Sequence, residues 1–330
     1  MAISQIALSR HSPTKFESGI QNLFLEAAPL LNLIPKVTNG SLQGRFRRIQ
    51  SLPTVGTRKL YEPFTESQGG WATDAFDIPI YGGLLKVDEQ LLTEPGGAEE
   101  WADQIELYTM AMAFQLNADA VTGDRAVDMD AMDGLKVQVA AAPSRMTLSP
   151  VVAGDLDLTS PATRKASAAE LTRLMDLAFL RIRQGTGGNP DLILMNDDLQ
   201  NLMQDAWRQS GFLTTTKDSL GRDFDTYKGA KIVPMGFTYG EALTQTDASN
   251  AIISPTFDGD GNTSMYFLRT GTQYVRWVQK HPLKVSEGAK NADGSSDDNM
   301  VVRVKKVEHP ITIHVKHPYA AARLKGITIQ

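Results

Sequence analysis

The sequence FDIPIYGGLLKVDEQLL (residues 76–92) leads into WADQIELYTMAMAFQLNADAV (residues 101–121). The first stretch closes a long β-like segment, Val37–Leu92, which Gly and Pro interrupt repeatedly. The second belongs to one uninterrupted helical pattern, Ala98–Thr122, which Gly123 stops. The β-like segment has too few apolar residues for a core of its own, so its strands need another surface to lie against. This order of segments indicates a building block rather than a self-contained enzyme.

The segment before the helix is predicted to be a long antiparallel hairpin. Glu62-Pro63 and Ser67-Gln68-Gly69-Gly70 supply turn chemistry, because Gly reaches positive φ and Pro fixes a bend. We therefore place the tip of the hairpin near residues 62–72. The strand-like pieces around it are residues 44–49, 57–61, 76–81 and 84–88.

The helical pattern of residues 98–122 would extend about 38 Å at a rise of about 1.5 Å per residue. Its apolar side chains form two stripes, which together cover much of the circumference. The sequence thus predicts a helix that runs through an interior. One stripe contains Trp101, Ile105, Tyr108 and Met112, and the other contains Leu107, Ala111, Phe114, Ala118 and Val121.

Further elements are predicted on both sides of this helix. A short amphipathic helix is expected at residues 13–32, and a β-rich passage around residues 134–137. Ser167 and Glu170 have the spacing of a capping box and predict the start of a second helix, while Asn196 is expected to cap a third. Strands are predicted at residues 192–195, 231–233, 265–268, 274–278, 300–307 and 311–315, and a mobile surface loop at residues 290–299.

Composition excludes several classes of protein. With 330 residues, 42% of them hydrophobic, the chain can bury a sizeable core. The absence of cysteine excludes disulfides and thiolate metal sites. The apolar runs are shorter than the roughly 20 residues of a membrane span, and the N-terminus resembles no signal sequence, so we expect a soluble, unexported protein without a membrane partner. A formal charge of -5 disfavours tight nucleic-acid binding but is compatible with loose enclosure of DNA.

Three motifs could carry chemistry, and each also has a structural interpretation. Asp258-Gly259-Asp260-Gly261-Asn262 resembles a calcium loop, but it lacks the sharp-turn Gly and the bidentate Glu, so an acidic turn is favoured. His309, His314 and His317 are three and five residues apart, spacings that point to opposite faces of a strand and disfavour a shared metal. Gly185-Thr186-Gly187-Gly188 lacks the Lys-Ser/Thr of a phosphate loop and is expected to end a helix. The sequence therefore predicts no catalytic residue, no metal site and no cofactor.

Two charged regions are the candidate contact surfaces. Both can be ordinary solvated faces, since surface ion pairs contribute only about 0–1 kcal/mol each. They can also pair between subunits, because complementary charges fix orientation. The basic region on the hairpin contains Arg45, Arg47, Arg48, Arg58 and Lys59, and the acidic region at the start of the long helix contains Glu94, Glu99, Glu100 and Asp103.

The order of these segments resembles the major capsid proteins of tailed double-stranded DNA bacteriophages, which have the Hong Kong 97-type α+β fold. FDIPIYGGLLKVDEQLL looks like the returning strand of that family's extended loop, and WADQIELYTMAMAFQLNADAV like its long spine helix. Asp133-Gly134-Leu135 resembles a short signature that follows the spine helix. Other similar pieces are PDLILMN at residues 190–196, YKGAKI at residues 227–232 and the closing HPYAAARLKGITIQ at residues 317–330.

The resemblance implies a division of the chain. Residues 1–35 would form the N-terminal arm and residues 36–89 the extended β-hairpin loop. The peripheral domain would comprise residues 90–142, with the spine helix at 98–122, and residues 276–330. Residues 143–275 would form the axial domain, which meets its copies around five-fold and six-fold axes.

The resemblance also implies a function. The chain would self-assemble as pentamers and hexamers into the icosahedral shell of a virion, formed in the bacterial host cytoplasm, and would contact packaged DNA only non-specifically. The sequence begins without the long scaffolding segment of some members, so a separate scaffolding protein is expected, with a portal and decoration proteins as further partners. Some members join subunits through a Lys–Asn isopeptide bond promoted by a Glu. Lys59 lies on the hairpin, but no aligned Asn or Glu is found, so this cross-link is not expected.

Two alternatives remain open at this point. An encapsulin-like compartment has the same fold and encloses a protein cargo instead of DNA. A metal-dependent hydrolase would use Asp258, Asp260 and the C-terminal histidines.

Overall fold

The computed structural model describes residues 28–88, 90, 97–151, 156–210, 214–217, 223–236, 251–254, 256–259, 262–287 and 302–329. Most of the helix predicted at residues 13–32 and the whole loop predicted at 290–299 lie outside these ranges. Within them, no helix combines the length and apolar composition needed to cross a bilayer.

The described elements follow the predicted order closely. The helices are α3 (Pro29–Leu33), α5 (Gly97–Thr122), α6 (Leu135–Ala140), α7 (Pro161–Thr186) and α8 (Asp197–Ser210), with a 3-10 turn at Ser144–Met146. The strands are β1 (Lys36–Thr38), β2 (Gln43–Ser51), β3 (Gly70–Asp77), β4 (Ile80–Asp88), β5 (Thr147–Leu148), β6 (Leu192–Met195), β7 (Thr214–Lys217), β8 (Asp223–Tyr227), β9 (Ala230–Pro234), β10 (Asn262–Leu268), β11 (Val275–Gln279), β12 (Lys284–Glu287), β13 (Val302–Val315) and β14 (Ala321–Thr328).

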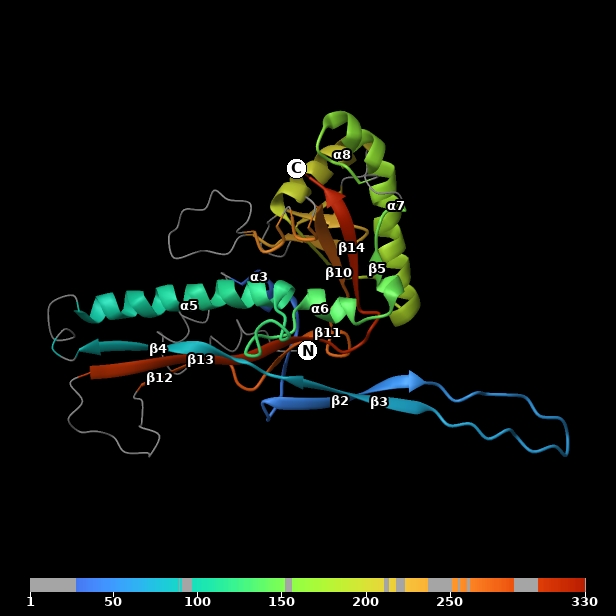
Figure 1. Ribbon diagram of the computed structural model, residues 1–330, viewed down its shortest axis with the longest axis horizontal. Helices are drawn as coiled ribbons and strands as arrows, with labels where there is room; N and C mark the ends of the chain where they lie inside the picture. The colour runs from blue at the N-terminus through green and yellow to red at the C-terminus, as the bar shows by residue number, and fades with distance from the viewer. Residues whose placement is uncertain are drawn as a thin grey trace.

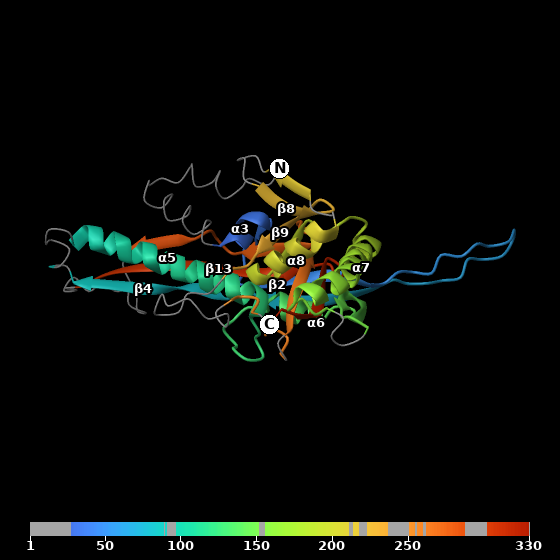
Figure 2. The same cartoon turned by 90° about the horizontal axis from the view of Figure 1, so that it is seen from above.

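The molecule is elongated and has three parts (Figure 1). A long layer consists of α5 lying along β4, β12 and β13. A second part, with α7, α8, β10 and β14, rises beside the C-terminal end of α5, near the middle of the whole molecule (Figure 1). The β2–β3 hairpin leaves the body on the side opposite to the start of α5, and the view from above has the same arrangement (Figure 2).

The long layer is built around β13. Strand β4 pairs antiparallel with one edge of β13, and β11 and β12 pair in turn with the other edge. The two strands predicted at 300–307 and 311–315 are therefore one strand. It continues through Pro310, which is registered with Ile80 of β4 and lies between the stretches paired with β12 and with β11.

Helix α5 covers the inner face of this sheet. Ile105, Met112 and Leu116 are buried, and the Tyr81 hydroxyl of β4 donates to an Asp119 carboxylate oxygen at 2.9 Å. The second predicted stripe is only partly buried, because Leu107 is 58% exposed and Phe114 is half-buried. The expectation that α5 runs through an interior is thus wrong for its first half, where the helix lies on the surface of the sheet.

The rising part is a seven-stranded sheet with the order β5-β14-β10-β6-β9-β8-β7. Successive side chains in a strand point to opposite faces, and both faces of the central strands are buried. Ile193 and Phe267 pack in a cluster with Leu174 of α7, whereas Leu194 and Tyr266 belong to the cluster that contains α5. Burial on both faces explains why residues 192–195 are continuously apolar.

The C-terminal strand changes the predicted division of the chain. Residues 276–330 were assigned to the peripheral domain, but β14 pairs with β10 and β5 of the seven-stranded sheet. Strands β11, β12 and β13 lie in the other sheet. We therefore propose that the axial domain consists of residues 143–275 together with residues 321–328, and the remaining boundaries stay predictions.

Two local predictions are wrong. Residues 135–140 form helix α6 rather than a β-rich passage. Helix α7 begins at Pro161 and not near Ser167: the Ser160 side chain accepts from the Thr163 N–H at 3.2 Å, and Thr163 completes the capping box. Ser167 lies inside the helix, where its hydroxyl donates to the Asp157 carbonyl at 3.0 Å. The predicted cap Asn196 is confirmed, since its side-chain oxygen accepts from the Asp198 N–H at 2.7 Å.

Candidate assembly surfaces

The hairpin is a separate two-stranded sheet. Strands β2 and β3 pair antiparallel with each other, from Gln43 opposite Asp77 to Ser51 opposite Gly70. Residues 52–69 extend beyond the strands without regular structure, and the chain reverses where the Glu62 N–H donates to the Lys59 carbonyl at 3.2 Å. The hairpin is therefore confirmed, but its tip is at residues 59–62 instead of 62–72, and residues 57–61 form no strand.

Large apolar side chains are exposed along this extended segment. No described part of the same subunit covers them. They are Leu52 (77% exposed), Val55 (92%), Leu60 (81%), Tyr61 (95%), Phe64 (65%) and Trp71 (62%). A patch of this kind on a soluble domain marks an interaction site. The charges of the hairpin were predicted to make contacts, whereas these apolar residues were not, although their occurrence in a segment without a core was the available signal.

The tip has a defined local conformation. Tyr61 has a φ of 70°, in the left-handed region that non-glycine residues seldom adopt. The Arg58 guanidinium lies 5.1 Å from the centre of the Phe64 ring and donates to the Glu62 carbonyl at 3.3 Å. These contacts hold the turn in a shape that exposes Leu60 and Tyr61.

The predicted contact residues are distributed over both ends of the molecule. Arg45 is exposed on β2 and Lys59 is exposed in the tip turn, while Asp103 is exposed on α5. The backbones of Arg47 and Arg48 pair with Thr73 and Ala72 in the hairpin. Glu99 and Glu100 belong to the first turn of α5. The side chains of these last four predicted residues (Arg47, Arg48, Glu99 and Glu100) lie outside the described part of the structure.

The two charged regions cannot meet within one subunit. The start of α5 and the hairpin lie at opposite ends of the long axis in both views (Figures 1 and 2). Any pairing between them must therefore join two copies of the chain, and this pairing stays a prediction.

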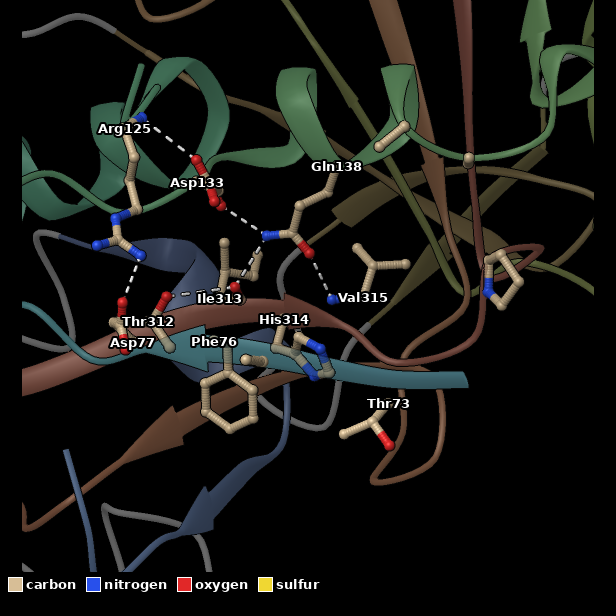
Figure 3. A pocket seen from close by; sticks show the side chains of 14 residues that line it. Thr73, Phe76, Asp77, Arg125, Asp133, Gln138, Thr312, Ile313, His314 and Val315 are labelled. Atoms are coloured by element: carbon tan, nitrogen blue, oxygen red, sulfur yellow. Dashed lines mark hydrogen bonds and ion pairs between the residues drawn. The ribbon is translucent and has the colours of Figure 1, made fainter. Parts of the chain in front are cut away.

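A pocket of about 410 Å³ lies at the base of the hairpin (Figure 3). One wall comes from β3, with Thr73, Phe76 and Asp77, and the other from the body of the subunit, with Arg125 and His314 among its residues. An ion pair joins the two walls, since Arg125 Nη1 lies 2.6 Å from Asp77 Oδ2. The pocket thus lies between the hairpin and the body, and the Asp77–Arg125 ion pair bridges the two beside it.

The motifs considered for metal binding serve structural contacts. Asp258 forms a largely buried ion pair with Arg323 and accepts a hydrogen bond from Ser264 at 2.6 Å. This interaction occupies the carboxylate that a calcium loop or a hydrolase would use. Asp260 lies outside the described residues.

The three C-terminal histidines have different neighbours. His309 Nε2 lies 3.3 Å from the Gln279 side-chain oxygen. The His314 ring stacks on Phe76 with centroids 4.8 Å apart, and His317 packs between Tyr274 and Tyr319. Among the described residues, no three potential ligands converge on one point. The loop at 185–188 ends α7, with Gly187 in the left-handed conformation, as predicted.

Solved structures with a similar fold were found for most of the chain. The holo-SrpI encapsulin complex from Synechococcus elongatus matches with a TM-score of 0.59 and 13% identity, over 91% of this chain and 87% of that one. The capsid of a native GTA particle matches with a TM-score of 0.57 and 14% identity, over 92% and 91%. A chain of Microbacterium phage Oxtober96 matches with a TM-score of 0.55 and 10% identity, over 92% and 91%. The chain has the Hong Kong 97-type capsid fold.

Within the Hong Kong 97-type fold, the β2–β3 hairpin is the extended loop and α5 is the spine helix, so the predicted α+β architecture is confirmed. No protein-family model and no curated protein matches the chain. At 10–14% identity, the fold persists although few side chains are shared.

Proposed function

We propose that this chain is a major capsid protein of a tailed phage, which self-assembles into an icosahedral shell around double-stranded DNA. The fold supports this function, and the observation that carries it is the extended hairpin with six exposed large apolar side chains. In a monomer these apolar side chains stay exposed to water, which is unfavourable, whereas a neighbouring copy can bury them.

The free energies of side-chain burial and of association favour a contact repeated in an assembly over a single pairwise contact. Burying one such side chain contributes about 1.5–3 kcal/mol, and association costs on the order of 4–15 kcal/mol in lost freedom. Several of the six side chains must therefore be buried together. A shell repeats the contact in every copy and closes the assembly without free edges.

In this proposed role the chain is structural, and the assembled particle needs further proteins. Pentamers and hexamers of the chain would form the shell in the host cytoplasm. A separate scaffolding protein, a portal and decoration proteins are the expected partners, and the packaged DNA would be contacted without sequence preference because the chain has a formal charge of -5.

Electron microscopy of particles from cells that express the chain tests this proposal. We expect closed shells of uniform diameter, formed by the chain alone or with its scaffolding protein. Only compact monomers under both conditions would contradict the proposal.

An encapsulin-like compartment is the second candidate. It is supported by the similarity to the SrpI encapsulin complex, whose TM-score of 0.59 is comparable to the 0.55 of the Microbacterium phage chain. The contents of native particles separate the two functions. Nuclease-protected double-stranded DNA supports the phage shell, and a single co-purifying protein inside the particles supports the compartment.

A further inference from the structure

The hairpin is attached to the body through few contacts. Its two strands pair only with each other within the described structure. The backbone is tied at its base, where the Ile78 N–H donates to the Leu42 carbonyl at 2.7 Å, and Pro79 then separates β3 from β4. Backbone hydrogen bonds join only the flanking residues to the body: the Asn39 N–H donates to the Gln279 carbonyl at 2.8 Å, and the Ile311 N–H donates to the Pro79 carbonyl at 3.2 Å. The described strands β2 and β3 make no backbone hydrogen bond to the body, so side chains must fix their direction beyond these points.

Phe76 is the first of these side chains. It lies opposite Gly44 in the hairpin register, and its ring occupies the space beside that glycine: a Cβ on residue 44 would come within 2.1 Å of the ring. The same ring stacks on His314 of β13, with centroids 4.8 Å apart and 28° between the planes. Phe76 therefore contacts the other strand of the hairpin and the body at once.

Asp77 provides the second attachment. Its carboxylate pairs with Arg125 at 2.6 Å, and the Arg125 backbone N–H donates to an Asp133 carboxylate oxygen at 3.2 Å (Figure 3). Two adjacent residues at the end of β3 thus make two different contacts with the body, one by stacking and one by charge.

The body side of this joint is held rigidly. The Gln138 side chain donates to the carbonyls of Asp133 and Ile313 at 2.6 and 2.9 Å and accepts from the Val315 N–H at 2.7 Å (Figure 3). It links the loop of Arg125 and helix α6 to the strand that carries His314. Arg125 and His314 therefore form a preformed receptor for the two hairpin residues.

The pocket beside the joint leaves the hairpin room to turn. A pocket of about 410 Å³ lies between β3 and the body near Thr73. The hairpin is therefore not supported there by packed side chains. Its direction then depends on the two contacts at residues 76 and 77.

We propose that Phe76 and Asp77 are positioning residues that fix the direction in which the hairpin leaves the subunit, through the His314 ring and the Arg125 guanidinium. This inference rests on the proposed function in one respect: the direction sets where the exposed tip meets a neighbouring copy, and therefore the curvature of the shell.

Spin-label distances test the positioning directly. The chain contains no cysteine, so Thr65→Cys near the tip and Lys165→Cys on α7 give two unique labels at exposed sites. Double electron–electron resonance on labelled subunits, diluted with unlabelled chain, measures the distance within one subunit in the free and in the assembled state. We expect one narrow distance distribution for the otherwise unchanged chain and at least a doubled width for Phe76→Ala/Asp77→Asn.

Two further variants control for folding and for specificity. Leu107→Ala removes an exposed apolar side chain on α5, away from the hairpin, and should leave the distribution narrow. Asp77→Arg should broaden the distribution, and the exchange Asp77→Arg/Arg125→Asp should narrow it again, which a general loss of stability would not do.

An unchanged distribution in Phe76→Ala/Asp77→Asn, or a broad one in the otherwise unchanged chain, would overturn the positioning role. The absence of shells would count against the proposed function alone, because the distance is measured within a subunit. In shells of the Phe76→Ala/Asp77→Asn variant we expect a wider range of diameters than in the unchanged chain.

Discussion

His309 and His314 lie five residues apart in β13, and both are buried. Burial, and then electrostatic interaction with Lys36 and His281, lowers the pKa of His309 to about 3. Burial, and then Arg276 and Lys316, lower the pKa of His314 to about 3. Both imidazoles are therefore neutral in the folded subunit over the whole physiological range.

This neutral state makes subunit stability depend on pH. The ordinary pKa of histidine is 6.5, so the unfolded chain binds more protons than the folded chain between that pH and about pH 3. The contribution of these two histidines to the free energy of unfolding should be constant above about pH 7 and should fall below pH 6, by up to about 1.4 kcal/mol per histidine per pH unit. Urea unfolding of the subunit at about pH 7.5 and about pH 5.5 measures this fall.

A matched variant isolates the contribution of the histidines. His309→Gln/His314→Gln removes both titrating groups and should have a flatter pH profile over the same range, whatever its absolute stability. Equal stability of the unchanged chain at the two pH values would contradict the burial of neutral histidines.

The surroundings of these two histidines were only partly predictable from the sequence. The spacing of the histidines was enough to place them on opposite faces of a strand. The partners of His309 and His314 were not predictable, because Gln279 and Phe76 reach them only through long-range strand pairing and through the docking of the hairpin. The exposed Leu60 and Tyr61 were missed because exposure depends on what the rest of the fold leaves uncovered.

Among the elements, the junction of α5 and α6 depends on a close approach at Gly134. A Cβ on this residue would lie 2.7 Å from the Asp119 carbonyl oxygen and 2.8 Å from that of Val121. Its φ of -74° is accessible to alanine, so the obstacle is backbone contact and not conformation. Gly134→Ala should destabilise the subunit by about 1–3 kcal/mol.

Gly40 is the matched control for this substitution, since a Cβ there meets nothing within 4 Å. Gly40→Ala should leave the denaturation midpoint unchanged or slightly raised. If the two alanine variants unfold at the same urea concentration, the junction is looser than described.

The two sides of α5 differ in burial and should differ in sensitivity to truncation. Leu116 is fully buried and Leu107 is 58% exposed. Leu116→Ala should cost about 2–5 kcal/mol of subunit stability, and Leu107→Ala should change it by less than about 0.5 kcal/mol. Chemical denaturation of both variants tests the surface position of the first half of α5, and a similar loss for both would contradict it.

Secondary structure was predictable where a pattern was long or strongly apolar, as in α5 and β6. It failed where two local signals competed. Ser167 and Glu170 matched a capping box, but Pro161 at the first helical position with Ser160 before it was the signal that the fold uses. Residues 135–140 contain valines typical of a strand, yet their contacts with α5 and β13 favour a helix.

For the whole molecule, the arrangement of charges predicts a contact between copies. Because the hairpin and the start of α5 lie at opposite ends (Figure 1), reversing Arg47 and Arg48 to Glu should impair assembly and leave the subunit folded. A second reversal, Glu99→Arg/Glu100→Arg, should restore part of it. Each exposed pair is weak and screened by salt, so light scattering at low ionic strength is the suitable measurement. Normal assembly of the first variant would contradict the charge pairing and leave the apolar tip as the remaining contact.

The order of segments was sufficient to predict the capsid fold, because a hairpin without its own core and a long helix after it are whole-molecule features that survive at 10–14% identity. The position of β14 was not predictable, since its pairing with β10 joins residues about sixty positions apart.

The central claim is that the exposed hairpin tip joins copies of this chain into a closed shell. Sedimentation velocity of the unchanged chain and of Leu60→Ser/Tyr61→Ser, both with circular dichroism as a check on folding, tests it most directly. We expect a single fast-sedimenting species for the unchanged chain and a folded, slowly sedimenting subunit for the variant. Shells formed equally well by the variant, or no assembly of either protein in the presence of the scaffolding protein, would contradict it.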